Sequence, residues 1–341
     1  MRKLWFLAVL LCAGLTTASV GAAADKQADL IEKAKKEGSI VSYTTSNSAD
    51  QEAIHKAFNQ KYPFIKIDGV KLQMENWTER VAAERAARRY ICDIGWGHIF
   101  AIAKNIKEGF LAPYNSPERG VLPNYYKDKE GLWSAYAVSY LTAGYNTDLV
   151  KQAEAPKTWD DLTNPKWKGK TVGDDYNIEL LSAMIDVWGK EKAVAFWKKI
   201  AANNAVMVQG RSNQTKLLAA GEYSLGIGLH AHEIITQRKS GAPVTWINSL
   251  NPMPALIQAI GLYKDAPHPN AAKLFIDWLL SPDGQKVFTA RGRIPSRPGS
   301  ATAAVLASGV QIVPVDTVMA AKEKDLGKLY WDTMGIKRVG R

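Results

Sequence analysis

Residues 39–63 read SIVSYTTSNSADQEAIHKAFNQKYP, and this stretch decides the fold class. Its first seven residues are rich in β-branched and aromatic side chains and end in a polar run, which favours a strand followed by a loop. The next part places apolar side chains at helical spacing and stops at Pro63, because proline cannot continue a helix. The stretch therefore predicts a strand, a short polar loop and a helix.

The same unit recurs along the chain. The segments that follow read IKIDGVKL, WTERVAAERAAR and ICDIGWG, a strand, a helix and a strand, and further units follow in TVGDDYNIELLSAMIDVWG and AVMVQGRSNQTKLLAAGEYSLGIGLHAHEIITQRKSG. This alternation predicts an α/β fold with a largely parallel sheet covered on both faces. Ligands of such sheets bind outside the carboxyl ends of the strands. The loops TTSNSAD and GWGHIF are therefore the first candidates for a functional site.

Residues 1–24 have the pattern of a secretory signal peptide. A basic start precedes the apolar run LWFLAVLLCAGL, and small residues ending in GAAA follow. The apolar run is too short to span a bilayer. We expect cleavage after Ala24, with Ala22 as the alternative site, and a mature protein in the periplasm. Lipid attachment at Cys12 is the less favoured alternative, because Leu11 stands where a lipoprotein signal has a small residue.

The remaining composition indicates an ordinary globular protein with two domains. About 317 of the 341 residues remain after removal of 24, which is more than one core usually accommodates. Cys92 is then the single cysteine, so no intramolecular disulfide can form. The formal net charge of +11 becomes +9 without Arg2 and Lys3. Lysine and arginine are interleaved with acidic residues and form no basic stripe, which argues against a nucleic-acid partner.

No enzyme motif stands out in this sequence. A G-x-S-x-G elbow, a Gly-rich phosphate loop ending in Lys-Ser or Lys-Thr, and G-x-G-x-x-G are all absent from it. His230 or His232 with Asp175 could form a catalytic pair, but no nucleophile is indicated. We therefore expect no catalysis, and keep a hydrolytic enzyme on a binding-protein fold as the alternative of another class.

The segment GEYSLGIGLHAHEI, residues 221–234, contains two histidines separated by one alanine. We expect strand-to-helix loops over Gly210–Ser212 and Leu229–Glu233, which puts HAHE at the end of a strand. Two histidines two positions apart cannot share a helical face, and the helical zinc motif H-E-x-x-H is absent. The histidines could be metal ligands, a proton-transfer pair or the lining of a solute pocket.

A set of short segments in a fixed order carries a family resemblance. The residue 39–63 stretch is followed by CDIGWG, KEGFLAPY, YLTAGYNTDLV, TWDDLTNPKWKGK, LLAAGEYSLGIG, PHPNAAKLFIDWLLSPDGQKVF and GRIPSRPG. In this respect the chain resembles the extracellular solute-binding proteins of ATP-driven (ABC) importers, in the family that includes ferric-iron-binding proteins. The resemblance covers nearly the whole mature chain.

The resemblance implies an architecture and partners. The fold is expected to be a two-lobed type II periplasmic binding protein, with mixed sheets, a hinge and two crossover strands near Ala135–Leu141 and Pro254–Gly261. One lobe would comprise residues 25–138 and 258–300, and the other residues 139–257 and 301–341. The implied partners of this monomer are a small-molecule solute and the inner-membrane permease of an ABC importer.

The same resemblance weakens iron as the solute. The adjacent tyrosines of ferric-binding relatives fall on Ala231 and His232, and the family's histidine, glutamate and arginine fall near Asn47, His98 and Ser139. His98 and His232, with Glu233, are what remains, and they would suit zinc or copper better than ferric iron. We expect no cofactor and no metal, with His98 and His232 as the alternative metal ligands.

The polar loops fit a small anionic solute, phosphorylated, phosphonate or carboxylate. Ser46 and Asn47 precede a helix, whose free N–H groups favour an anion, although simple helix capping is the structural alternative. Arg211 offers a fork for paired oxygens, and its loss is expected to leave stability nearly unchanged. Trp96 could form a platform, and His232 could donate to the solute. The candidate ligand-binding residues are Thr45, Ser46, Asn47, Trp96, Gly97, Tyr140, Asp175, Tyr176, Arg211, Ser212, His230, His232 and Glu233.

Overall fold

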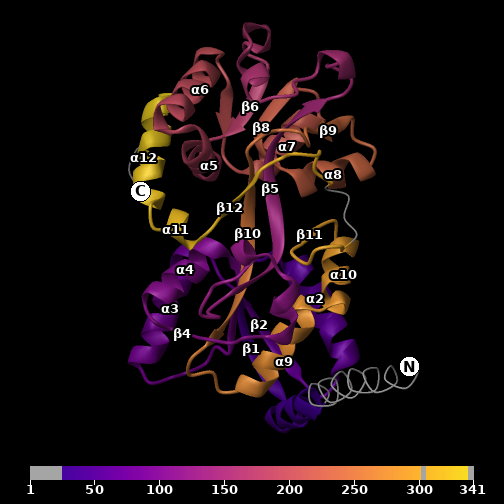
Figure 1. The fold of residues 1–341 in the computed structure, drawn as a ribbon, viewed down its shortest axis with the longest axis vertical. Coiled ribbons are helices and arrows are strands. Elements are labelled where there is room, and N and C mark those ends of the chain that lie inside the picture. Colours follow the sequence, from indigo (N-terminus) through magenta and orange to yellow (C-terminus); the bar gives the residue numbers. More distant parts are fainter. Residues whose placement is uncertain (1–24, 301–304, 337–341) are drawn as a thin grey trace, which may run out of the picture.

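The computed structural model describes residues 25–300 and 305–336. The expected signal peptide, residues 1–24, and its Cys12 lie outside the described residues. The chain forms two lobes, one above the other in Figure 1, joined along their common axis by two long strands. Among the described residues, no helix is long and apolar enough to cross a membrane.

The lower lobe in Figure 1 contains the first βαβαβ unit. A helix over residues 25–37 precedes it. The elements of this lobe are β1 (Ser39–Thr44), α2 (Ser48–Lys61), β2 (Lys66–Lys71), α3 (Met74–Ala86), β3 (Ile94–His98), α4 (Ile99–Lys107), β4 (Leu111–Ala112), the short 3₁₀ helices Pro117–Val121 and Asn124–Tyr126, α9 (Pro269–Leu280), α10 (Pro282–Ala290) and β11 (Ile294–Pro295). β1 pairs in parallel with both β2 and β3, as expected for this unit.

The upper lobe repeats the arrangement. Its elements are the 3₁₀ helices Gln152–Glu154, Asp160–Thr163 and Pro165–Trp167, then β6 (Thr171–Asp174), α5 (Ile178–Trp188), α6 (Lys190–Ala202), β7 (Val206–Val208), α7 (Arg211–Ala219), β8 (Leu225–His230), α8 (Ala231–Lys239), β9 (Val244–Trp246) and α12 (Glu323–Met334). β6 pairs in parallel with β7 and β8. Parallel strands with helical crossovers thus form both lobes, and the predicted fold class is confirmed.

Two long strands, β5 (Ser134–Asn146) and β10 (Met253–Tyr263), connect the lobes. The first half of β5 pairs with β10, and its second half pairs with β8 and β9 of the upper lobe. β10 in turn pairs with β3 of the lower lobe. These are the two crossover strands expected near residues 135–141 and 254–261.

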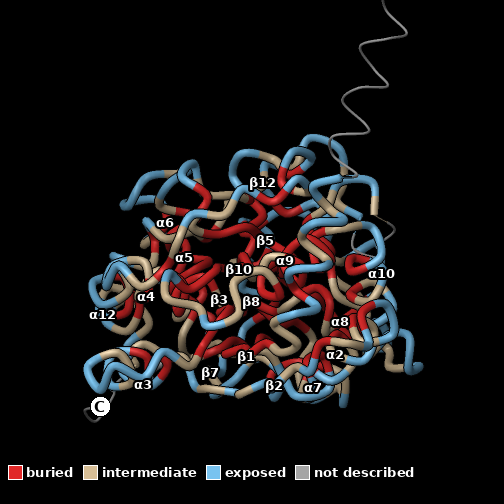
Figure 2. The backbone as a smooth tube through the Cα atoms, turned by 90° about the horizontal axis from the view of Figure 1, so that it is seen from below, coloured by how far each residue is buried: buried red, intermediate tan, exposed pale blue. Residues whose placement is uncertain are grey.

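The central strands form the core. Figure 2 shows buried chain along β5, β10, β3 and β8, and exposed chain on the outer helices. Every residue of β5 is buried, and β10 is buried except at Gln258. Strands covered on both faces have such continuous burial. Gln258 is therefore a polar exception in the middle of the molecule.

The C-terminal segment runs past both lobes. β12 (Ile312–Val315) pairs in parallel with the start of β10, and the short α11 (Thr317–Ala320) packs on α4 of the lower lobe. α12 then packs on α5 and α6 of the upper lobe. α11 thus contacts the lower lobe and α12 the upper lobe, and the assignment of residues 301–341 to one lobe stays a prediction.

Several expected boundaries were wrong at the strand ends. α7 begins at Arg211, directly after the positive-φ Gly210, so Arg211 and Ser212 form its first turn. β8 ends at His230 and α8 begins at Ala231, so the expected loop over Leu229–Glu233 does not exist. HAHE therefore spans the strand-to-helix junction itself.

Candidate functional site

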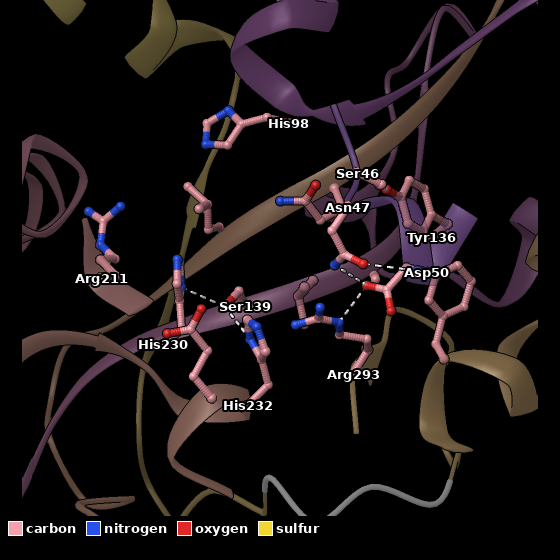
Figure 3. Close-up of a pocket in the computed structure, with 16 residues that line it drawn as sticks. Ser46, Asn47, Asp50, His98, Tyr136, Ser139, Arg211, His230, His232 and Arg293 are labelled. Atoms are coloured by element: carbon pink, nitrogen blue, oxygen red, sulfur yellow. Dashed lines mark hydrogen bonds and ion pairs between the residues drawn. The ribbon is translucent and has the colours of Figure 1, made fainter. Parts of the chain in front are cut away.

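A cavity of about 260 Å³ lies between the two lobes, at the carboxyl ends of β1, β3 and β8. Both lobes and both crossover strands contribute polar side chains to it, and Figure 3 shows these side chains converging from several directions. The polar lining residues are Ser46, Asn47, Asp50, His98, Tyr136, Ser139, Arg211, His230, His232, Glu233, Gln258 and Arg293.

The start of α2 forms one wall. Asn47 is the N-cap, and its Oδ1 accepts the Asp50 N–H at 2.9 Å while its Nδ2 donates to Asp50 Oδ2 at 2.8 Å. The Asp50 carboxylate also accepts from Nε of Arg291 at 3.0 Å and from Nε of Arg293 at 2.8 Å. Two guanidinium groups against one carboxylate leave a positive charge in excess at this wall. The capping alternative at this helix is thus realised, by Asn47.

His98, at the junction of β3 and α4 in the lower lobe, also lines the cavity. It caps α4, because its Nδ1 accepts the Phe100 N–H at 3.2 Å. Burial lowers the pKa of His98 from its ordinary value to about 4. The ring is therefore neutral at pH 7, and its proton is on Nε2, since Nδ1 is an acceptor.

Arg211 is anchored by the upper lobe. Its Nε donates to the Gly228 carbonyl at 3.1 Å, and its Nη2 donates to Glu179 Oε2 at 2.8 Å and to the Tyr176 carbonyl at 3.2 Å. The side chains of Arg211 and Glu179 are only 15 % and 6 % exposed. The expectation that Arg211 is dispensable for stability is corrected, because its removal would leave a buried carboxylate without its partner.

Ser139 of β5 joins the two histidines of the HAHE junction. Its Oγ lies 2.8 Å from His230 Nδ1 and 2.9 Å from His232 Nδ1, and the two rings stack with centroids 5.2 Å apart. Burial lowers the pKa of His232 to about 3 and that of His230 well below its ordinary value. Both rings are thus neutral at pH 7 in this arrangement.

In residues 25–300 and 305–336, no three His, Cys, Asp or Glu side chains converge in a way that could hold a metal ion. Figure 3 places His98 on the far side of the cavity from His232. In this arrangement His230 and His232 share hydrogen bonds with Ser139, and His98 accepts one from the Phe100 N–H.

Residues 92–312 match the sequence profile of a family described as bacterial extracellular solute-binding protein. The match covers more than half of the chain. The chain belongs to this family of solute-binding proteins.

Individual relatives of this solute-binding protein have different ligands in their names. A putative 2-aminoethylphosphonate-binding periplasmic protein of Salmonella typhi is 29% identical over 252 residues, which are 69% of this chain and 73% of the relative. Iron-bound HitA from Pseudomonas aeruginosa superposes with a TM-score of 0.74 at 19% identity, over 86% of this chain and 99% of HitA. AfuA from Actinobacillus pleuropneumoniae, with fructose-6-phosphate bound, gives 0.71 at 22%, over 88% and 99%. The two structural likenesses support the two-lobed fold.

Six of the thirteen candidate ligand-binding residues line the cavity of this solute-binding protein, as does His98, the alternative metal ligand. The six are Ser46, Asn47, Arg211, His230, His232 and Glu233. Each of them lies at or near a strand end or a helix start, which is where the sequence argument placed a ligand. Their contact with a solute stays a prediction.

Ser212 lies outside the cavity, at a neighbouring hollow. Its hydroxyl donates to Glu233 Oε1 at 2.7 Å, and Thr215 donates to Glu233 Oε2 at 3.2 Å. Both residues line a hollow of about 480 Å³ beside the cavity, which also contains Lys216 and Arg291. Glu233 lines both spaces, so it stands at the boundary between them.

Trp96 is part of the core instead of a platform for a ligand. Its side chain is 0% exposed and packs edge-on against Tyr136 with ring centroids 5.6 Å apart. Gly97 and Thr45 meet behind the cavity wall, where Thr45 Oγ1 accepts the His98 N–H at 2.9 Å. A side chain on Gly97 would overlap that hydroxyl. These three residues support the wall and do not line the cavity.

Asp175, Tyr176 and Tyr140 also lie outside the cavity lining. α5 begins at Ile178, so Asp175 and Tyr176 lie in the turn that precedes this helix. The Tyr176 ring packs on Trp331 of α12 with centroids 5.5 Å apart, and Tyr140 is buried. The C-terminal helix thus covers the Asp175–Tyr176 turn, which the sequence order could not reveal.

Sequence reasoning missed Asp50, Tyr136, Gln258 and Arg293 as lining residues, and gave Ser139 only as the position of a relative's arginine. Arg293 lies in GRIPSRPG, far along the chain from Asp50, and no periodicity links the two. Gln258 could have been found, since it is a lone amide in the apolar crossover segment MPALIQAIGLY.

Proposed function

We propose that this chain is an exported receptor that captures a small polar, anionic organic solute between its lobes and delivers it to the inner-membrane permease of an ABC importer. The observation that carries the proposal is the interlobe cavity, because it receives polar side chains from both lobes and from both crossover strands. Its volume of about 260 Å³ fits a small solute. Phosphorylated, phosphonate and carboxylate compounds are the proposed solute class.

Charge and helix starts support an anion. The Asp50 wall has a positive charge in excess, from Arg291 and Arg293. α8 begins at the cavity with no side-chain cap, so the N–H groups of its first turn remain available to an acceptor. The ligands named for relatives, 2-aminoethylphosphonate and fructose-6-phosphate, are also anions.

Enclosure explains how such a receptor would bind tightly. We propose that residues 25–138 with 258–300 and residues 139–257 with 301–341 move as two bodies about β5 and β10. Each lobe supplies only part of the contacts, so a solute that bridges Asn47 and His98 to His230 and Arg211 favours the closed form. This is a population shift driven by differential affinity for the two forms.

The test begins with the solute itself. The mature protein is purified without denaturation, the solute is released, and mass spectrometry identifies it. Calorimetry then measures its affinity for the parent protein and for Gln258→Leu, which keeps the volume but removes the amide from the cavity. Gln152→Leu, on an exposed 3₁₀ helix, is the matched control.

We expect Gln258→Leu to weaken binding and Gln152→Leu to leave it unchanged. Equal affinity in the three proteins would place the solute elsewhere. Chemical conversion of the identified solute during incubation would overturn the receptor role in favour of an enzyme.

A further inference from the structure

The hydroxyl of Ser139 restricts where the protons of His230 and His232 can be. It contacts both Nδ1 atoms, at 2.8 and 2.9 Å. A serine hydroxyl has one proton to donate and two lone pairs to accept with. It can therefore donate to one Nδ1 and accept from the other, or accept from both. It cannot donate to both.

The single hydroxyl proton of Ser139 determines where at least one of the two histidine rings has its own proton. In either arrangement at least one ring has its proton on Nδ1. A neutral imidazole has a single N–H, so the Nε2 atom of that ring presents a lone pair. Neither Nε2 atom has a hydrogen-bond partner among residues 25–300 and 305–336, and both rings line the cavity. The upper lobe therefore offers a solute at least one unprotonated acceptor.

The surroundings keep both rings neutral. Arg211 faces them from α7, Arg293 from the segment after α10, and His98 from the end of β3, and all of these disfavour a further positive charge. The opposing carboxylate is Asp50 of α2, which is already held by two arginines. Protonation of both stacked rings is further opposed by their mutual repulsion, since their centroids are 5.2 Å apart.

The lower lobe offers the opposite polarity. His98 Nδ1 accepts from the Phe100 N–H, so the neutral ring has its proton on Nε2. Figure 3 shows His98 across the cavity from His230. The cavity thus has an N–H donor on one side and an imidazole lone pair on the other.

We propose that Ser139 makes the cavity selective for solutes that carry a hydrogen-bond donor, an ammonium or hydroxyl group, beside their anionic group. An anion without a donor would meet the lone pair with another lone pair. This inference rests on the proposed function and narrows its solute class to amino- or hydroxy-substituted organic anions. Ser139 is a positioning residue in this scheme, because it acts through the two histidines.

The first test needs no solute. The five histidines of the chain are labelled with ¹⁵N, and long-range ¹H–¹⁵N spectra at pH 7.5 report which nitrogen of each ring has the proton. Single His→Gln variants assign the signals. We expect the Nδ1–H form in His230, His232 or both, and the Nε2–H form in His98. Nε2–H forms in both His230 and His232 would overturn the inference.

Two variants of Ser139 sharpen this test. Ser139→Ala removes the shared hydroxyl, so the Nδ1–H population should fall. Ser139→Thr keeps a hydroxyl and should restore it. Circular dichroism verifies that both variants are folded. An Nδ1–H population equal to the parent's in Ser139→Ala would show that another group sets the tautomer.

The second test measures selectivity with three phosphonates of similar size. These are 2-aminoethylphosphonate, 2-hydroxyethylphosphonate and propylphosphonate, in which a methyl group replaces the donor. We expect the parent to bind at least one donor-bearing compound roughly tenfold or more tightly than propylphosphonate. Ser139→Ala should reduce that ratio, and the exposed Ser240→Ala should not. The pattern among the first two compounds distinguishes an ammonium from a hydroxyl.

The binding measurements distinguish a failure of this inference from a failure of the proposed function. Equal affinity for the three phosphonates overturns the selectivity while leaving the receptor role intact. If none of the three binds, the histidine spectra still decide the tautomer, and the solute released from native protein must contain a donor. Absence of any bound or binding anion would count against the receptor itself.

Discussion

The guanidinium of Arg211 is engaged by the protein itself, through Glu179, the Gly228 carbonyl and the Tyr176 carbonyl. We predict that Arg211→Ala lowers the free energy of unfolding of the solute-free protein by about 3 kcal/mol, because Glu179 is left buried and unpaired. Urea unfolding measures this. Arg238→Ala, whose side chain contacts Thr245 at the surface, should change it by less than about 0.5 kcal/mol.

A double variant separates the ion pair from other effects of Arg211. Adding Glu179→Gln to Arg211→Ala removes the stranded charge, so part of the lost stability should return. Solute affinity should also fall in Arg211→Ala, by roughly 2 to 4 kcal/mol if the guanidinium contacts the anion. Unchanged unfolding in Arg211→Ala would mean that the pair with Glu179 contributes nothing.

We expect the cavity not to bind ferric iron through a tyrosinate. The family resemblance implies that Ala231 and His232 stand where ferric-binding relatives have paired tyrosines. The phenol that lines the cavity, Tyr136, shares a hydrogen bond with Ser46 Oγ at 3.1 Å. Burial raises the pKa of Tyr136, which keeps it protonated. We predict no visible tyrosinate-to-iron absorption after ferric citrate is added. A strong band at one iron per chain, lost in Tyr136→Phe, would contradict this.

At the scale of elements, most strands and helices could be predicted from the sequence, because the switch between β-rich and helical spacing is local. The junctions could not. The loops predicted at Gly210–Ser212 and Leu229–Glu233 are much shorter in the structure, because α7 begins at Arg211 and α8 begins at Ala231, directly after β8. The fate of Trp96 was also hidden, because Tyr136 and α2 cover it only after distant strands have paired.

A bulge at Gly228 shapes the end of β8. The register against β5 shifts between Thr142 and Ala143, so Gly228 lies opposite no residue of β5, and its φ is 78°. Its free carbonyl accepts from Arg211 Nε. Bulges re-aim side chains near functional sites, and this one directly precedes the HAHE junction.

We predict that Gly228→Ala destabilises the protein by about 3 kcal/mol, because the new Cβ needs an unfavourable φ and overlaps the Asn177 amide. Gly241→Ala is the matched control, since Gly241 has a φ of 90° and no atom near its missing Cβ. It should cost only about 1 kcal/mol. Equal losses in thermal or urea unfolding would show that the Asn177 contact is harmless.

At the scale of the whole molecule, the resemblance gave the correct architecture, whereas the cavity chemistry depends on residues from distant parts of the chain that meet only in the folded protein. Asp50 reaches Arg291 and Arg293 from a distance of about 240 positions in sequence. Ser139 reaches His230 and His232 from another strand. Such pairings follow from the crossover topology and have no local signal.

We expect the three cavity histidines to make the equilibrium between the closed and open forms depend on pH. His98 and His232 have pKa values lowered to about 4 and about 3 by burial between the lobes, and that of His230 is also lowered. Opening the lobes would hydrate these rings and return their pKa values toward 6.5. The closed form then binds fewer protons than the open form, so its advantage is lost as the pH falls from 6.5 toward 4.

We predict that the solute-free protein opens between pH 7.5 and pH 5, by roughly 2 kcal/mol for each histidine that regains its ordinary pKa. Small-angle X-ray scattering should show a larger radius of gyration at pH 5 while circular dichroism remains native.

A variant with His98, His230 and His232 replaced by glutamine should lose the effect. His55 of α2 provides the control, because burial lowers its pKa to about 4 while its ring lies near Trp96 and Phe275, outside the cavity lining. His55→Gln should retain the opening, because hydration of the cleft does not reach that ring. A radius that stays constant in the parent would show that the lobes close without regard to these histidines.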